Sequence, residues 1–130
     1  MGRPSIIVVS SEAYRKLADR FYNYQVMLGY VPHSNRSKFL TLNEFFQWLE
    51  SRGMADVAGV TPPVISAYYG YLSSRPSRNS GGALNQKTVC RAMYIVRDFF
   101  EMLVRERKIR ANPFGTLEFP YPQEEAPERT

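Results

Sequence analysis

The stretch Asn85–Arg107, NQKTVCRAMYIVRDFFEMLVRER, decides the fold of this 130-residue chain. Its apolar residues recur at steps of four, three, four and three, in the series Val89, Met93, Val96, Phe100 and Leu103. Because an α-helix turns once in about 3.6 residues, this spacing puts the series on one helical face. Asn85 precedes the series and is a preferred N-cap residue. The stretch therefore predicts a long amphipathic helix that runs to about Arg107 and buries one face.

The same periodicity predicts a first helix over residues 11–28. Ser10 or Ser11 can cap its start, and Gly29 followed by Pro32 ends it. Its inward face is the series Tyr14, Leu17, Phe21, Tyr24 and Leu28. The short apolar run of residues 6–9 before this helix is interpreted as an extended arm.

A second helix is predicted to end at Gly53, but its start is ambiguous. Thr41 and Glu44 match a capping box, whereas Ser34 could cap a longer helix that begins at Asn35. We prefer the longer helix because the apolar stripe already includes Phe39. The stripe consists of Phe39, Leu42, Phe46 and Leu49, widened by Phe45 and Trp48.

A third helix is predicted to begin at Thr61-Pro62-Pro63, because proline at the first helical position lacks only an N–H that was unpaired anyway. The residues expected to face inward are Ile65, Tyr68 and Leu72. The loop Arg75–Leu84 that follows consists of turn-forming residues and two arginines. We expect this loop to be mobile without a ligand.

After the fourth helix the chain is predicted to fold back and then become a linker. Asn112-Pro113 blocks a longer helix, and three apolar residues can return to the bundle, namely Phe114, Leu117 and Phe119. From Pro120 the chain is rich in proline and glutamate without periodicity. We therefore expect an all-α fold, a compact bundle of four main helices over residues 11–119, with an arm over 1–10 and a linker over 120–130.

The charge distribution is uneven along the chain. The net charge is +5, yet residues 118–130 hold four glutamates against one arginine, so the remaining body carries +8. No acidic residue lies between Asp56 and Asp98, a stretch that contains Arg75, Arg78, Lys87, Arg91 and Arg97. One-signed segments attract polyanions, although a positive face can also serve only solubility.

Catalytic and metal-binding chemistry is not expected from these residues. The chain has one cysteine, Cys90, and one histidine, His33, so it has no disulfide within the chain and no ligand set spaced for zinc. Cys90 follows Val89 on the fourth helix and is interpreted as a small packed hydrophobe. No signal peptide or membrane span is recognisable. We therefore expect a cytoplasmic protein with no cofactor, no small-molecule substrate and no membrane partner.

Two predicted helix starts combine basic with hydrogen-bonding side chains. The N-terminus of a helix offers unpaired N–H groups and a positive dipole end, so such a start can meet phosphates or the base edges of a major groove. The candidate DNA-binding residues are Ser34, Asn35, Arg36 and Lys38, with Ser37 beside them, then Arg75 and Arg78 in the loop, and Asn85, Gln86, Lys87, Thr88 and Arg91.

The alternative is that these residues are ordinary caps and solvated first-turn groups. Basic residues in a first turn oppose the helix dipole and cost about a few tenths of a kcal/mol each at exposed sites. Their presence at two helix starts therefore favours a polyanionic partner.

Five pieces of the chain follow one another in a fairly specific order and spacing. They are Phe45–Leu49 with Gly53, Thr61–Ile65 with Tyr68 and Leu72, Lys87–Arg91, Ile95–Phe100, and Ile109–Pro113. In this respect the region from about Ser34 to Pro120 resembles the core-binding domain of tyrosine recombinases, the phage-integrase and Xer-like group, a domain also described as SAM-like.

The resemblance implies a helical bundle that forms half of a C-shaped clamp on duplex DNA, with the starts of the second and fourth helices facing the major groove. It also implies that strand cleavage and rejoining, through a tyrosyl-phosphate intermediate, belong to a following catalytic domain. The chain stops at Thr130, where that domain would begin. We therefore expect no enzyme in this chain itself, and assign no tyrosine the role of nucleophile. The implied partners are a recombination site in DNA and other recombinase protomers, in a bacterial or phage-derived, nucleoid-associated setting such as a mobile element.

The sequence departs from the family pattern at two places where contacts with DNA are predicted. The loop Arg75–Leu84 is longer and richer in glycine than in compact members, and Lys38 stands where an aromatic residue is common. Two other functions remain open at this point. They are a helical protein-interaction module, which would dock through its aromatic surface and first helix, and a stand-alone DNA-binding regulator with a layout similar to a helix-turn-helix.

Overall fold

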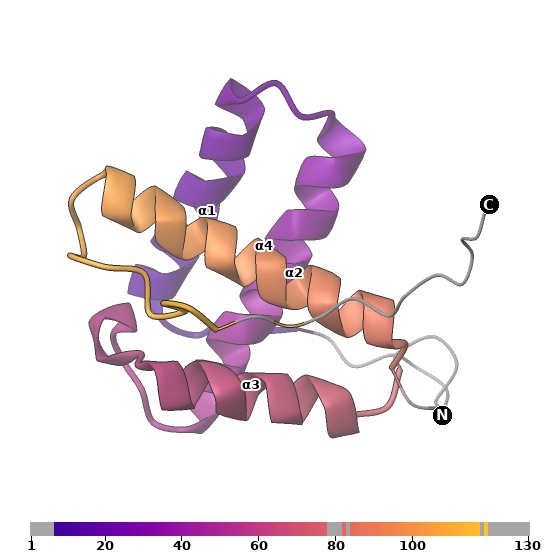
Figure 1. The fold of residues 1–130 in the computed structure, drawn as a ribbon. Helices are drawn as coiled ribbons and strands as arrows, with labels where there is room; N and C mark the ends of the chain where they lie inside the picture. Colours follow the sequence, from indigo (N-terminus) through magenta and orange to yellow (C-terminus); the bar gives the residue numbers. More distant parts are fainter. Residues whose placement is uncertain (1–6, 78–81, 83, 118, 120–130) are drawn as a thin grey trace.

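Four α-helices and one short 3-10 helix make up the fold in the computed structural model (Figure 1). The structure describes residues 7–77, 82, 84–117 and 119. The elements are α1 (Glu12–Met27), α2 (Pro32–Ser51), η1 (Val57–Gly59), α3 (Pro62–Ser74) and α4 (Gln86–Arg105). No β-strand occurs among the described residues. The predicted all-α bundle of four main helices is confirmed, while η1 was not predicted.

The ends of α1 and α4 lie close to the predicted positions. The Ser11 hydroxyl accepts a hydrogen bond from the Tyr14 N–H at 3.2 Å and caps α1, and Gly29 adopts a φ of +90° just after it. The Asn85 side chain accepts from the Lys87 N–H at 2.7 Å and caps α4, as predicted. α4 ends at Arg105, two residues before the predicted Arg107.

The prediction for the start of α2 was wrong. The helix begins at Pro32 with Val31 as its N-cap, so neither Ser34 nor Thr41 caps it. Pro32 had been interpreted only as the end of the first helix, yet proline suits the first helical position because its φ is already helical. Asn35 therefore lies in the second turn, and its N–H donates to the Val31 carbonyl at 3.0 Å. The free N–H groups of α2 belong to residues before Asn35.

The core is built around two adjacent aromatic residues of α2. The Phe45 ring lies 4.9 Å from the Tyr68 ring of α3 and 5.9 Å from the Phe100 ring of α4, measured between centroids. The Phe46 ring stacks on Tyr14 of α1 at 4.7 Å and meets Phe99 of α4 at 5.3 Å. Edge-to-face and stacked rings at such distances add stability beyond the burial of their area. All four helices therefore meet at this pair.

The periodic face of α4 is buried as predicted. All five residues of its apolar series are inaccessible or nearly so, as are the predicted inward residues of α3. Cys90 is also fully buried, in agreement with its interpretation as a packed hydrophobe. After α4, Phe114 and Phe119 return to the core, and Leu117 packs against it. The fold-back after Asn112-Pro113 is thus confirmed.

The helices α1 and α2 form an antiparallel hairpin, and α4 crosses it (Figure 1). α3 packs against α4, and its Tyr68 and Tyr71 rings meet Trp48 near the end of α2. No helix of the described part is long and apolar enough to cross a membrane. The expected linker over 120–130 lies outside the described residues, as do residues 1–6 of the expected arm and residues 78–81 and 83 of the loop expected to be mobile.

Replacement of Phe45 by alanine should lower the free energy of unfolding by about 3–5 kcal/mol, because the ring is fully buried among rings of α3 and α4. Urea unfolding followed by circular dichroism measures the change. Leu40→Ala on the same helix is the control, since Leu40 is 44% exposed and should change stability by less than about 0.5 kcal/mol. Similar losses in the two variants would contradict a core centred on Phe45.

Candidate functional site

The start of α4 presents a polar, basic surface. The predicted residues Asn85, Gln86, Lys87, Thr88 and Arg91 are all exposed. The Gln86 side-chain amide donates to the Tyr69 hydroxyl of α3 at 2.8 Å, which ties the first residue of α4 to its neighbour helix. Lys87 and Arg91 stand four residues apart and therefore on one face of the helix.

The predicted residues of α2 differ in their exposure. Arg36 is exposed, whereas Ser34 is half-buried and Asn35 is buried at 1% exposure. The Asn35 amide donates to the Tyr30 carbonyl at 3.0 Å, so this side chain holds the turn between α1 and α2. Its carbonyl oxygen is buried and has no hydrogen-bond partner among the described residues. The Asn35 side chain is thus buried and stabilises the α1–α2 turn from within the protein.

Lys38 also takes part in contacts within the protein. Its ammonium group donates to the Gln25 side-chain oxygen at 3.0 Å and lies 3.6 Å from the centre of the Tyr30 ring. Burial lowers the pKa of Lys38, which the negative charge of Asp98 opposes and the positive charge of Arg91 reinforces. Lys38 is therefore a cation that already has partners at the base of the α1–α2 turn.

One hydrogen bond joins the two basic segments that the sequence singled out. The Arg91 guanidinium of α4 donates to the Ser37 hydroxyl of α2 at 3.1 Å. Lys38, next to Ser37 on α2, lies near enough to Arg91 for the positive charge of Arg91 to act on its pKa. Lys87 lies one turn before Arg91 on α4, and Arg36 precedes Ser37 at the edge of a hollow between α1 and α2. We call the group Arg36, Ser37, Lys38, Lys87 and Arg91 the α2/α4 surface.

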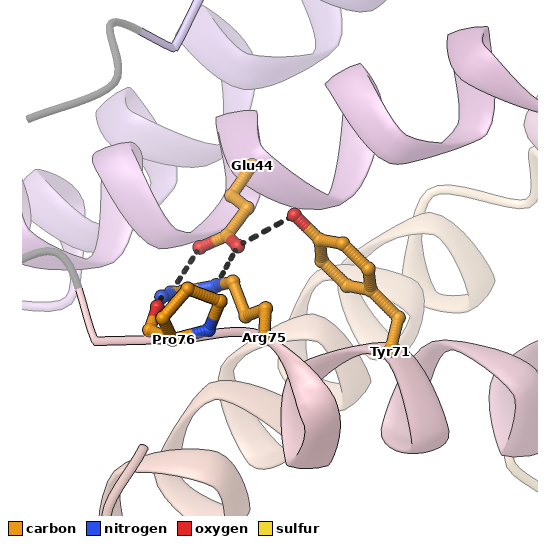
Figure 2. A network of polar contacts seen from close by, with 4 residues as sticks. All are labelled: Glu44, Tyr71, Arg75 and Pro76. Carbon is orange, nitrogen blue, oxygen red and sulfur yellow. Dashed lines mark hydrogen bonds and ion pairs between the residues drawn. The ribbon is translucent and has the colours of Figure 1, made fainter. Parts of the chain in front are cut away.

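Arg75 does not belong to this exposed group. Figure 2 shows its guanidinium against the carboxylate of Glu44, with Nε 2.6 Å from Oε2 and Nη2 3.0 Å from Oε1. The Tyr71 hydroxyl donates to the same carboxylate at 3.3 Å. The side chains of Arg75 and Glu44 are only 15% and 7% exposed. Arg78, the other predicted loop residue, lies outside the described residues.

Sequence reasoning missed the role of Glu44. The residue was weighed only as part of a capping box, although an acidic residue inside the apolar stripe of residues 39–49 is itself unusual. Charged residues are rarely buried without a partner, so this position could have been assigned a cationic partner. Which cation it pairs with depends on the fold, because Arg75 is 31 residues away in sequence.

His33 lies at an open hollow between α1 and α2. The hollow has a volume of about 460 Å³ and is lined by Asp19, Tyr22, Pro32, His33, Arg36 and Phe39. No group of three or more histidine, cysteine, aspartate or glutamate side chains in the described part of the chain could hold a metal ion. The arrangement at the α2/α4 surface is instead one that can attract phosphate groups, through exposed cations beside a helix start.

Comparisons with known proteins give relatives from one enzyme family. Tyrosine recombinase XerC of Leptospira interrogans is 26% identical over 119 residues, which is 91% of this chain and 36% of the relative. Tyrosine recombinase XerC 2 of Ralstonia nicotianae is 30% identical over 95 residues, which is 73% of this chain and 27% of the relative. No protein-family model and no solved structure matches the chain.

The chain spans about a third of the length of these curated relatives. The similarity extends over nine-tenths of the chain in the Leptospira relative and over about three-quarters of it in the Ralstonia relative. The family named by the sequence motifs and the family found by comparison are the same. Together, the motifs and the curated relatives support a Xer-like tyrosine recombinase domain.

Proposed function

We propose that this chain is the core-binding domain of a site-specific tyrosine recombinase or integrase and that its α2/α4 surface contacts duplex DNA. The observation that carries the proposal is the Arg91–Ser37 hydrogen bond, which joins two basic segments from distant parts of the sequence. Similarity to tyrosine recombinases supports DNA as the polyanion that this surface meets.

The proposed contacts divide into two kinds. Arg36, Lys87 and Arg91 are exposed cations that meet phosphate oxygens, and such contacts supply affinity without reading the sequence. Asn85, Gln86 and Thr88 lie at the start of α4, where short polar side chains can approach base edges in a major groove. Asn35 and Lys38 support the α2 side of the surface through hydrogen bonds within the protein, and the half-buried Ser34 lies next to Asn35.

The domain organisation proposed for the full protein follows from the same assignment. We propose that residues 11–119 contain the DNA-binding bundle and that a catalytic domain follows it; the predicted arm (1–10) and linker (120–130) lie wholly or mainly outside the described residues. That domain supplies the chemistry of strand exchange, and this chain holds the DNA for it. The coverage of only 27–36% of the curated relatives is consistent with a separate region for catalysis.

The α1–α2 turn carries a feature that favours a protein partner in addition to DNA. Five large apolar side chains at this turn are about half exposed or more, with Met27 at 83%, and they are Val26, Met27, Leu28, Tyr30 and Val31. Exposed apolar side chains that gather at one turn are typical of a protein contact surface. We propose that it meets another recombinase protomer on the DNA.

Asp98 places a negative charge near the cations of the α2/α4 surface. It follows Arg91 by two helical turns and so lies on the same face of α4. Burial raises the pKa of the Asp98 carboxyl, while the positive charges of Lys38 and Arg97 act in the opposite direction. An ionised carboxylate here opposes the approach of phosphate, so its protonation should favour DNA binding.

Lys87→Ala and Arg91→Ala should each weaken binding of the 130-residue chain to a duplex of about 30 base pairs, because each removes a cation that meets a phosphate. For each phosphate that is no longer neutralised, the slope of log affinity against log salt should become less negative by about 0.9. Fluorescence anisotropy between about 50 and 200 mM salt measures both quantities.

Lys16→Ala is the matched control for this series. Lys16 has a side chain 76% exposed on α1 and lies in the hollow that includes Glu106, near the opposite end of α4. Its replacement removes the same charge from the chain but should leave the salt slope close to that of the wild type. Equal effects of all three replacements would show general attraction by net charge and contradict the assigned surface.

Asp98→Asn should bind the same duplex about two- to fivefold more tightly at pH 7, because one opposing charge is removed. As pH falls through the raised pKa of Asp98, the wild type loses that charge too, so the two affinities should converge. A pH series of anisotropy titrations measures this. Glu12→Gln on α1, with a side chain 75% exposed, should show no such convergence. Weaker binding by Asp98→Asn would place this carboxylate away from the DNA.

A further inference from the structure

We propose that Arg75 and Glu44 are positioning residues that hold the start of α4 in place for DNA binding, and that Arg75 itself makes no contact with DNA. The inference rests on the proposed function of the α2/α4 surface. It replaces the contact role that the sequence suggested for Arg75 with a role inside the protein.

Arg75 and Glu44 form an enclosed ion pair that connects the end of α3 to α2, and we call this pair the strut. The guanidinium meets both carboxylate oxygens, at 2.6 and 3.0 Å, which is the bidentate arrangement specific to arginine (Figure 2). With 15% and 7% of their side chains exposed, the two residues are shielded from salt far more than a surface pair would be. An arginine so enclosed offers little of its guanidinium to a phosphate.

The position of Arg75 in the chain links this strut to the loop before α4. α3 ends at Ser74, and Arg75 leaves the helix with a ψ of 150°. Its Nη1 donates to the Pro76 carbonyl at 2.8 Å, which holds the second residue of the loop. The Ser77 N–H then donates to the Gly82 carbonyl at 2.6 Å and brings the two ends of the loop together. Asn85, the cap of α4, follows only three residues later.

The other end of the strut lies on the helix that forms the second half of the surface. Glu44 stands on α2, about two turns after Ser37, and the Tyr71 hydroxyl of α3 meets the same carboxylate. On the far side of the loop, Gln86 of α4 is tied to Tyr69 of α3 at 2.8 Å. The start of α4 is therefore connected to α3 by Gln86, and the end of α3 is connected by Arg75 to α2, the helix that carries Ser37.

Two variants distinguish positioning from direct contact. Arg75→Lys keeps the positive charge but cannot make the bidentate pair, so a phosphate contact would survive while the strut would not. Glu44→Gln keeps the shape of the side chain and one carbonyl acceptor but removes the negative charge. It would release Arg75 toward DNA if Arg75 were a contact residue, and it would weaken the strut if Arg75 is a positioning residue.

We expect both variants to bind a duplex of about 30 base pairs more weakly, by roughly two- to thirtyfold in fluorescence anisotropy, the range measured for residues that act through others. Neither should steepen the dependence of affinity on salt, because no new phosphate contact forms. Arg52→Lys is the matched control for the first variant, since Arg52 is exposed and lies over the Trp48 ring at 4.8 Å. Glu12→Gln is the control for the second, and both controls should bind as the wild type does.

Arg75→Lys at wild-type affinity, or Glu44→Gln with tighter binding and a steeper salt slope, would overturn the inference while leaving the DNA-binding function in place. Absence of DNA binding by the wild type itself would overturn both. Circular dichroism and thermal unfolding show whether each variant is folded at the temperature of the titration. Should Glu44→Gln unfold, Arg75→Lys decides alone, because it retains the charge and one hydrogen bond to Glu44.

Discussion

Phe45 and Phe46 of α2 contact rings from each of the other three helices, and the rest of the structure depends on this junction. Adjacent residues on a helix point about 100° apart, so two neighbouring aromatics can face two sides of a crowded core. Phe45 faces α3 and α4, while Phe46 faces α1 and α4. The crossing of α4 over the α1–α2 pair follows from this arrangement, because its own aromatic residues Phe99 and Phe100 meet the same two rings.

Around this apolar centre, two polar contacts between described residues join α2 to other parts of the bundle through an arginine. Arg91 reaches Ser37 where α4 passes the early turns of α2, and Arg75 reaches Glu44 about two turns further along α2. The first contact is exposed and leaves the guanidinium accessible, whereas the second is enclosed. Two arginines with the same chemistry thereby differ in what they can do. A cation at the rim can meet an external anion, but a cation enclosed with its own carboxylate gives rigidity.

Most of the fold could be predicted from the residues, whereas the candidate site could be predicted only in part. The caps Ser11 and Asn85 and the buried faces of α3 and α4 were recognisable because periodicity and capping act over a few residues. The start of α2 was misplaced because Pro32 suits both the end of one helix and the beginning of the next. Within the site, Lys87 and Arg91 are exposed as a polar helix face should be. Asn35 and Arg75 are enclosed by residues whose proximity no local pattern shows.

By itself, the sequence determined that this chain is helical, that it has one apolar core, and that its positive charge lies in its body. These properties follow from local spacing and composition. The motifs also named the family that comparison with curated relatives supports. Only the tertiary structure decided which charges stay at the surface and which are paired inside. That choice depends on the packing of helices separated by tens of residues, as in the pairs Arg91–Ser37 and Arg75–Glu44, and a side chain's partner is set by where the backbone carries it.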